Sequence, residues 1–333
     1  MFIVSNYFTA VILCFVTMLC WGSWGNTQKL AAKSWRYELF YWDYVIGMVL
    51  FAALLGFTLG SFGEGGRSFV DDIAQADKSA LGWVLLGGVI FNASNILLSA
   101  SISLAGLSVA FPLGVGLALV LGVIVNYIGT PTGDPTLLFA GVALIVVALV
   151  CNGIASGKQQ TQSTGGNRKG IVLAALAGVL MAFFYRFVVK GMDVEHLASP
   201  AAGMVTPYTA IFVFSLGVLA SNAIFNTLVM RYPFTGEPVK YSEYFKGSFP
   251  THLVGCLGGA IWCLGTALSY IASGVAGPAV SYALGQGAPM IAAVWGIFIW
   301  KEFKGASRKV GLLLALMFVL FIVGLGLIVA AGN

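Results

Sequence analysis

Amide side chains stand inside long apolar stretches of this chain, where a polar group is costly unless it meets a partner. Asn92 and Asn95 lie three residues apart in one apolar stretch, and Gln286 lies in another. Residues three apart share a helix face, so we expect Asn92 and Asn95 to point the same way. An amide donates and accepts hydrogen bonds without carrying charge. The pattern favours reversible binding of a neutral polar solute, and an interhelical hydrogen bond is the alternative for each amide.

Aromatic residues away from the ends of the apolar stretches add flat surfaces to these amides. Rings stack on one another while amides satisfy donors and acceptors, so the combination suits a ring-shaped, polar, uncharged ligand. Core packing explains any single aromatic side chain equally well, and for Trp262 it is the simpler interpretation. The candidate solute-binding residues are Trp21, Trp24, Asn92, Asn95, Tyr185, Trp262, Tyr270 and Gln286.

Asp43 is the ionisable residue that lies deepest in an apolar stretch of a chain in which 9% of residues are charged. Burial in a low dielectric disfavours the charged carboxylate, which makes Asp43 a candidate to bind and release a proton during a transport cycle. Two other roles are open. Asp43 could interact with the helix dipole in the first turns, or it could pair with Lys29.

Composition defines the elements that must position these residues. Of 333 residues, 59% are hydrophobic, and the mean hydropathy is +0.94, whereas a soluble domain is about 25% charged. The chain is therefore predicted to be an all-α integral membrane protein, with the lipid bilayer as a partner. A span needs about 20 apolar residues, and ten segments qualify: 6–24, 37–59, 80–103, 106–128, 136–155, 170–188, 202–225, 251–274, 276–299 and 307–330.

Several classes of chemistry lack their signatures. The sequence has no phosphate-binding G-x-x-x-x-G-K-[ST] loop, no H-E-x-x-H pair and no nucleophile elbow. The five cysteines fall inside predicted spans at no metal-ligand spacing. We therefore expect no enzymatic activity, no cofactor, no metal and no nucleic-acid partner.

Basic residues predict the orientation in the membrane, because positively charged loops resist crossing it. Thirteen of the 17 lie at the odd-numbered connections. The four at even-numbered connections are Arg67, Lys78, Arg186 and Lys190. Both termini are thus expected on the non-cytoplasmic side of a plasma or inner membrane. A cytoplasmic hinge carries Lys29, Lys33 and Arg36, and the aromatic residues Trp35, Tyr37, Tyr41 and Trp42 beside it resemble an interfacial belt.

The sequence repeats itself with an offset of 171 residues. Residues 86–116 align without a gap on residues 257–287, with eleven identical positions. A repeat unit of five helices is odd, so the two copies must insert in opposite orientations, the 5+5 inverted repeat typical of secondary transporters. The predicted parts are a first repeat (1–157), a cytoplasmic linker (158–169) and a second repeat (170–333). Small residues allow close helix packing, and the candidates are Gly87, Gly88, Gly114, Gly116, Gly258, Gly259, Gly285 and Gly287.

The chain also resembles a known family. The matching motifs are WGSW at 21–24, DY at 43–44, the pair Gly87-Gly88 followed by Asn95, GLSV at 106–109, NY at 126–127 and FAGVA at 139–143. They resemble the ureide permeases of the drug/metabolite transporter superfamily, whose bacterial relatives take up glucose, ribose and rhamnose. The resemblance implies proton-coupled import of allantoin, uracil or related bases, or of a sugar. It gives added weight to Gly22, Trp24, Asp43, Tyr44, Gly87, Gly88 and Asn95.

One departure from the family is the region between the two halves, which is long in the plant members and short here. The sequence thus predicts a secondary active importer of a small neutral polar solute, a ureide or nucleobase or else a sugar, working by alternating access. An exporter of drugs or metabolites from the same superfamily is the alternative. A membrane scaffold is a third class, but it would have no need of two mirrored halves. The oligomeric state is open.

Overall fold

The computed structural model describes residues 1–32, 35–63, 65–159 and 168–333. Within these ranges ten helices are long and apolar enough to cross a membrane, which confirms the predicted number. Nine spans are single helices: α1 (Tyr7–Ala31), α2 (Tyr37–Phe57), α4 (Lys78–Ala105), α5 (Leu107–Gly129), α6 (Pro135–Gln159), α7 (Arg168–Gly191), α8 (Pro207–Arg231), α10 (Phe249–Ala276) and α13 (Arg308–Ala331). The ninth span in chain order is broken into α11 (Pro278–Gly285), α12 (Ala288–Val294) and the π-helix η1 (Trp295–Ile299). Two short helices, α3 (Phe69–Gln75) and α9 (Tyr241–Tyr244), lie in connections.

The first span is longer than its sequence suggests. α1 continues through a polar stretch to Ala31, and the side chains of Asn26, Thr27 and Gln28 are buried. Lys29 therefore belongs to the last turn of α1, where a cation favours the helix dipole, and not to a hinge. Lys33, the second residue of the predicted hinge, lies outside the described residues.

The seventh span begins later than predicted, at Pro207 instead of residue 202. Proline is well suited to the first helical turn, where its missing N–H costs no hydrogen bond. The residues before it are held as a loop by Arg67, whose guanidinium donates to the carbonyls of Pro200 and Met204, each at 2.6 Å. Arg67 also bonds the buried carboxylate of Asp72 at 2.9 Å.

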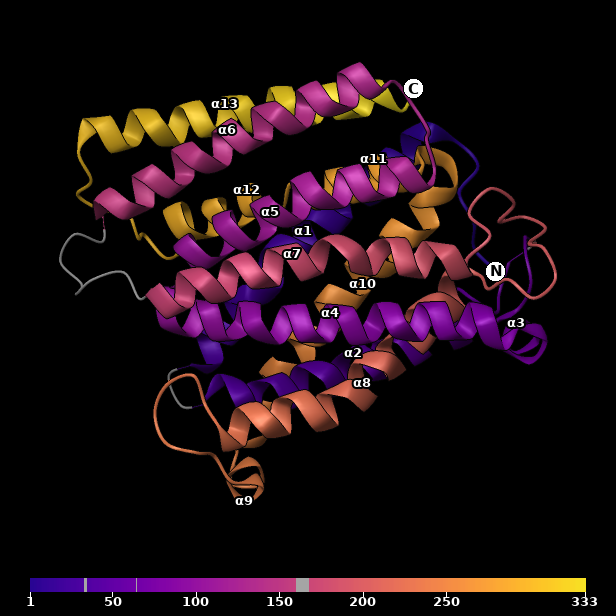
Figure 1. The fold of residues 1–333 in the computed structure, drawn as a ribbon, viewed down its shortest axis with the longest axis horizontal. Coiled ribbons are helices and arrows are strands. Elements are labelled where there is room, and N and C mark those ends of the chain that lie inside the picture. Colours follow the sequence, from indigo (N-terminus) through magenta and orange to yellow (C-terminus); the bar gives the residue numbers. More distant parts are fainter. Residues whose placement is uncertain (33–34, 64, 160–167) are drawn as a thin grey trace.

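The helices pack in pairs that join the two halves of the chain. α1 packs against α10, and α4 packs against α7. α6 packs against α13, and these two helices lie side by side along one edge of the bundle (Figure 1). α2 and α8 form the opposite edge. The N- and C-termini lie at one end of the bundle and α9 lies at the other, here called the linker end because α6 ends and α7 begins there.

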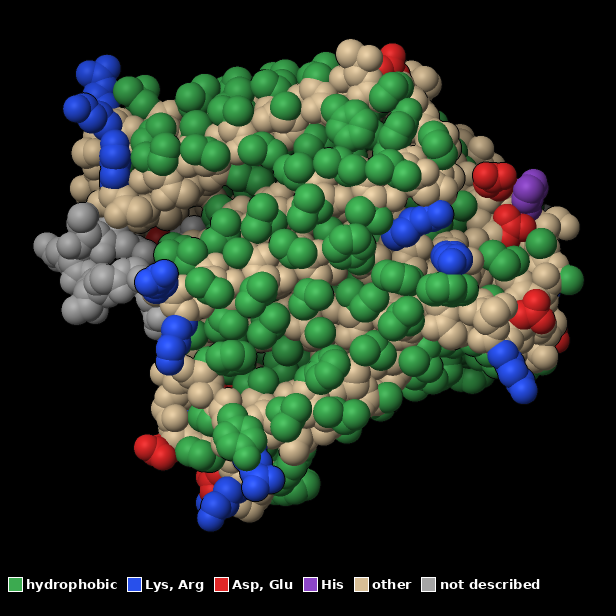
Figure 2. Space-filling view, viewed as in Figure 1, with side chains coloured by type: hydrophobic (Ala, Val, Ile, Leu, Met, Phe, Trp, Pro, Cys, Tyr) green, Lys and Arg blue, Asp and Glu red, His purple; other side chains and the backbone are tan. Residues whose placement is uncertain are grey.

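Basic side chains gather at the linker end. On the face shown in Figure 2, most Lys and Arg residues lie at the end where α9 is found, whereas acidic residues are more frequent at the other end. Hydrophobic side chains cover the surface between the two ends. On this face, the bias predicted along the sequence is thus an asymmetry between the two ends.

The repeated connection has the same backbone in both halves. Gly106 has φ 81° and ψ 159°, and Gly277 has φ 78° and ψ 151°. Each glycine ends one helix and begins the next, in a left-handed conformation that an L side chain adopts only with strain. The aligned segments therefore share a helix–glycine–helix turn.

The candidate packing glycines all face another helix at close range. Gly87 and Gly114 face α7, Gly88 faces α8, Gly116 faces α6, Gly258, Gly285 and Gly287 face α1, and Gly259 faces α2. At the contact between α2 and α10, each helix presents a glycine to the backbone of the other. A Cβ on Gly259 would overlap the carbonyl oxygen of Tyr44, and one on Gly47 would overlap that of Cys256.

We expect Gly259→Ala to destabilise the protein, because the added methyl group forces α10 away from the α2 backbone. Overpacking of this kind costs about 1–3 kcal/mol. Gly153→Ala is the matched control, since a Cβ there meets no atom within 4 Å. Thermal unfolding of both purified variants in detergent measures the difference. Equal unfolding temperatures would contradict the expected role of this contact.

Candidate functional site

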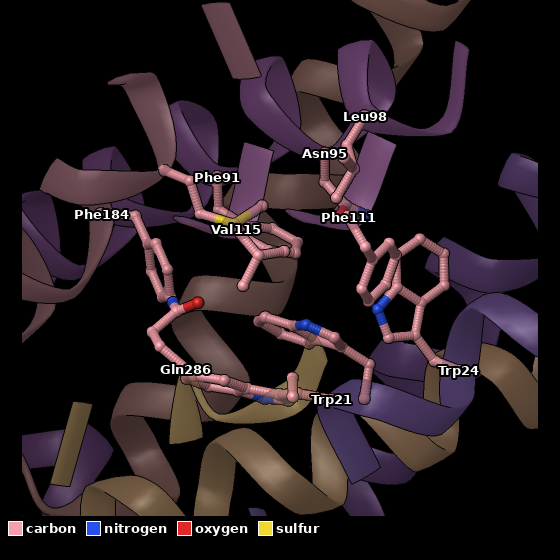
Figure 3. A pocket seen from close by; sticks show the side chains of 12 residues that line it. Trp21, Trp24, Phe91, Asn95, Leu98, Phe111, Val115, Phe184 and Gln286 are labelled. Carbon is pink, nitrogen blue, oxygen red and sulfur yellow. The ribbon is translucent and has the colours of Figure 1, made fainter. Parts of the chain in front are cut away.

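A cavity in the middle of the bundle brings together five of the eight predicted solute-binding residues. These are Trp21, Trp24, Asn95, Trp262 and Gln286. The remaining lining side chains are apolar: Phe91, Leu98, Phe111, Val115, Met181, Phe184 and Ala288. Sequence reasoning notes Phe184 as an aromatic residue away from the end of its predicted span, but it missed the other six because they resemble ordinary core residues. Both halves of the chain contribute to the wall (Figure 3).

Stacked aromatic rings form one wall of the cavity. Trp21 and Trp262 lie nearly parallel, with ring centroids 6.2 Å apart and an interplanar angle of 11°. Phe91 lies against Trp262 at 4.1 Å between centroids. The indole N–H of Trp21 donates to the hydroxyl of Thr266 at 3.0 Å, which fixes the orientation of that ring. The wall therefore offers flat faces already held in position.

Asn95 supplies a polar atom without a protein partner. Its amide nitrogen donates to the Tyr41 hydroxyl at 3.3 Å. The amide oxygen is buried and has no hydrogen-bond partner among the described residues. A buried acceptor left unpaired costs free energy, and a solute donor would relieve that cost. Tyr41 is itself fully buried, so its assignment to an interfacial belt is wrong.

Gln286 reaches the cavity from the break in the ninth span. α11 ends at Gly285 and α12 begins at Ala288, with Pro289 in the first turn of α12. The ninth span is thus interrupted at Gln286. The side chain of Gln286 is buried and lies across the cavity from Asn95 (Figure 3). Two amides from opposite halves therefore face the same space.

The cavity is small in this conformation. Its volume, measured as the space open to the centres of water molecules, is about 30 Å³, which is room for one or two waters. An organic solute of about ten heavy atoms enters only if side chains or helices move. Met181 is the flexible member of the wall, whereas Trp21 is held by Thr266.

The other three predicted residues lie outside the cavity wall. Asn92 donates to the Ser221 hydroxyl of α8 at 2.9 Å. Tyr185 contacts the Ser269 hydroxyl at 2.9 Å, and its ring lies 5.3 Å from that of Tyr270. Asn92 and Asn95 were expected to point the same way, but residues three apart still differ by about 60° around a helix. Because α4 is surrounded by other helices, that angle sends the two amides to different neighbours.

Asp43 lies in a separate cluster at the linker end of α2. Its side chain is 1% exposed, and Oδ1 lies 2.8 Å from Nδ1 of His252 in the first turn of α10. The hydroxyl of Tyr244, on α9, donates to the same oxygen. Lys29 instead pairs with Glu302, so the proposed pairing of Asp43 with Lys29 is wrong.

Burial and the neighbouring carboxylate of Asp43 raise the pKa of Tyr244 above its usual value of 10. Tyr244 therefore remains a protonated donor at neutral pH. His252 is 25% exposed and packs edge-on against Trp35 at 5.2 Å between ring centroids. His252 thus joins the buried carboxylate to the surface.

Sequence reasoning did not single out His252 or Tyr244. One signal was available for the histidine. It is one of two in the chain, and it stands at the start of the predicted span 251–274. Nothing in the sequence placed Tyr244 against a residue two hundred positions away.

Comparisons with known proteins identify the family of the chain. The ureide permease family matches residues 40–164 and 160–331 of the chain. Ureide permease 1 of Arabidopsis thaliana is 22% identical, with 100% of this chain and 99% of the relative covered. Ureide permease 5 of the same plant is 23% identical over 100% and 96%. An L-rhamnose-proton symporter of Yersinia pestis is 28% identical, over 43% of this chain and 45% of the symporter.

A solved crystal structure shares the fold, with a TM-score of 0.55 at 16% sequence identity over 95% of this chain and 96% of that one. The curated relatives are named as permeases and symporters, which makes the chain a multi-pass membrane transporter of small solutes and not an enzyme. Because the family match covers nearly all of the sequence from residue 40 onward, the protein belongs to the ureide permease family.

Proposed function

We propose that the protein is a proton-coupled importer of a small neutral polar solute, a ureide or nucleobase or else a sugar. The observation that carries the proposal is the central cavity, in which Asn95 and Gln286 face one another between aromatic walls. The unpaired amide oxygen of Asn95 would accept a hydrogen bond from the solute.

The lining of the cavity favours a neutral ligand. Among the described residues, no side chain that lines it carries a charge. A solute ring would stack on the tryptophans, and its polar groups would bond the amides. Relatives named for ureides and for L-rhamnose support both solute classes. For the alternative, an exporter of drugs or metabolites, the same lining disfavours a cationic substrate, because Asp43 lies outside the cavity wall.

Alternating access is the mechanism that we propose. Contacts between the halves come in matching sets, since α1 meets α10 as α4 meets α7, and α2 meets α10 as α4 meets α8. The shared turns at Gly106 and Gly277 support a common ancestry of the two halves. Five helices in each half would give them opposite orientations, so that one cavity can face the two sides in turn.

Proton coupling is assigned to Asp43. The groups that face its carboxyl are Tyr244 from α9, His252 and Cys256 from α10, and Trp35 before α2. His252 would deliver the proton, because its ring is both partly exposed and bonded to the carboxylate. Coupling to the cavity would pass through α2, since the next residue, Tyr44, packs on Trp24 at 5.1 Å.

The basic linker end would face the cytoplasm, by the positive-inside tendency. Both termini would then lie on the other side, in a plasma or inner membrane.

Replacing Asn95 with leucine should raise the KM for uptake roughly tenfold, because a polar group of the solute would be left unpaired. Asn92→Leu is the matched control, since Asn92 bonds Ser221 and lies outside the cavity wall. We expect that variant to lose thermal stability with little change in KM. The measurement is uptake of labelled allantoin, uracil, glucose and ribose into proteoliposomes. Indistinguishable KM values for N95L and the unmodified protein would remove Asn95 from the site.

Asp43→Asn should abolish the stimulation of uptake by an inward proton gradient, since the amide cannot release a proton. Exchange of labelled for unlabelled solute should persist, because the cavity wall is unchanged. Glu243→Gln is the control, an exposed carboxylate at the same end that pairs with Lys246. Proton-driven accumulation that survives in D43N would disprove the coupling role.

Alkaline phosphatase fused after Asn333 should be active in bacterial cells, because the C-terminus is expected outside the cytoplasm. The same enzyme inserted between α6 and α7 should be inactive. The opposite pattern would reverse the proposed orientation.

A further inference from the structure

A second cavity lies between α5, α6, α12 and η1, on the linker side of the central one. Phe111 lines both cavities. Its side chain is 2% exposed and packs against Trp24 at 6.2 Å between ring centroids. The two cavities are therefore adjacent, and a single aromatic ring forms part of the partition between them.

The second cavity contains polar groups that a solute could bond. Ser156 is 2% exposed, and its hydroxyl has no hydrogen-bond partner among the described residues. The amide of Asn152 and the carboxylate of Glu302 line the same space. An unpaired buried hydroxyl beside an amide and a carboxylate offers donors and acceptors to a neutral polar molecule.

A row of contacts joins α1 to the η1 region, and one of its members, Glu302, also lines the second cavity. The indole N–H of Trp295 donates to the Ser23 hydroxyl at 2.9 Å, and that of Trp300 donates to the amide oxygen of Asn26 at 2.6 Å. The third contact is the ion pair of Lys29 with Glu302. We call these three pairs the α1–η1 seam.

The contacts of the α1–η1 seam are weak enough to break and re-form. Its α1 members stand three residues apart, at positions 23, 26 and 29, so each contact lies about one turn further along the helix. Lys29 and Glu302 are 34% and 29% exposed, so their attraction is screened by solvent and is weak. The π-helix opposite is a conformation found often at functional sites.

We propose that the second cavity is a vestibule for the neutral solute on the linker side, reached from the central cavity past Phe111 and opened when the α1–η1 seam separates. The proposal rests on the proposed transport function for the identity of its ligand. The opening of the seam can be tested without any solute.

The test is the reaction of a cysteine placed at Ser156 with a charged, water-soluble methanethiosulfonate, followed by peptide mass spectrometry so that native cysteines can remain. We expect Trp300→Phe to raise the labelling rate of S156C about three- to tenfold, because loss of the indole donor to Asn26 lets the seam open more often without changing a charge or the cavity wall. Ile154→Cys is the control on the same helix, since Ile154 is 46% exposed on the outer surface of the bundle. Its labelling should be slow and unaffected by W300F.

Gel filtration and thermal unfolding of each variant establish that the protein remains folded. An unchanged S156C rate in folded W300F, or a parallel rise at I154C, would overturn the seam as the gate of the vestibule. A second arm adds allantoin, uracil or L-rhamnose at saturating concentration. Any of these that proteoliposomes take up should slow labelling of S156C. A transported solute that gives no protection would overturn the vestibule, whereas absence of uptake for all three would count against the proposed function alone.

Discussion

The close approach of α10 to α1 and α2 positions both the cavity and the carboxylate cluster. Without a hydrophobic force between helices in lipid, such contacts depend on small residues that let backbones meet. Gly255, Gly258 and Gly259 leave room for Asp43, Thr27 and the Tyr44 carbonyl. A side chain at these positions would separate α10 from its neighbours. The stacking of Trp262 on Trp21, and the bond of His252 to Asp43, would both be lost.

α10 therefore contacts both the Asp43 cluster and the wall of the cavity. His252 and Gly255 meet Asp43 near its first turns, and Trp262 and Thr266 meet Trp21 further along. A change in the charge of Asp43 would alter the contact between α2 and α10, and the surface of α10 that makes this contact continues to the cavity. In our proposal this shared interface couples the proton to the solute.

At each end of the bundle an arginine bonds a buried carboxylate and loop carbonyls. At the end that holds the termini, Arg67 bonds the buried carboxylate of Asp72 and several loop carbonyls, so many bonds must break together for that loop to move. At the linker end, Arg36 bonds the buried carboxylate of Glu38 and the carbonyls of Glu237 and Thr235. The α1–η1 seam at the same end consists of three partly exposed pairs of side chains, in which Lys29 also contacts the ring of Trp300. The conformation described here is closed around a space of one or two waters.

The sequence by itself determined the membrane class, the number of spans, the repeat and the family, because these depend on apolar length and on local motifs. It also singled out Trp21, Trp24, Asn95, Trp262 and Gln286, since polar and aromatic groups inside a span stand out against an apolar background. Only the tertiary structure decided which of these residues share a cavity. Asn92 and Asn95 have the same chemistry and nearly the same helical face, but their partners lie on α8 and α2. The partners of Asp43 were equally hidden, because His252 and Tyr244 are brought to it by helix packing across some two hundred residues of chain.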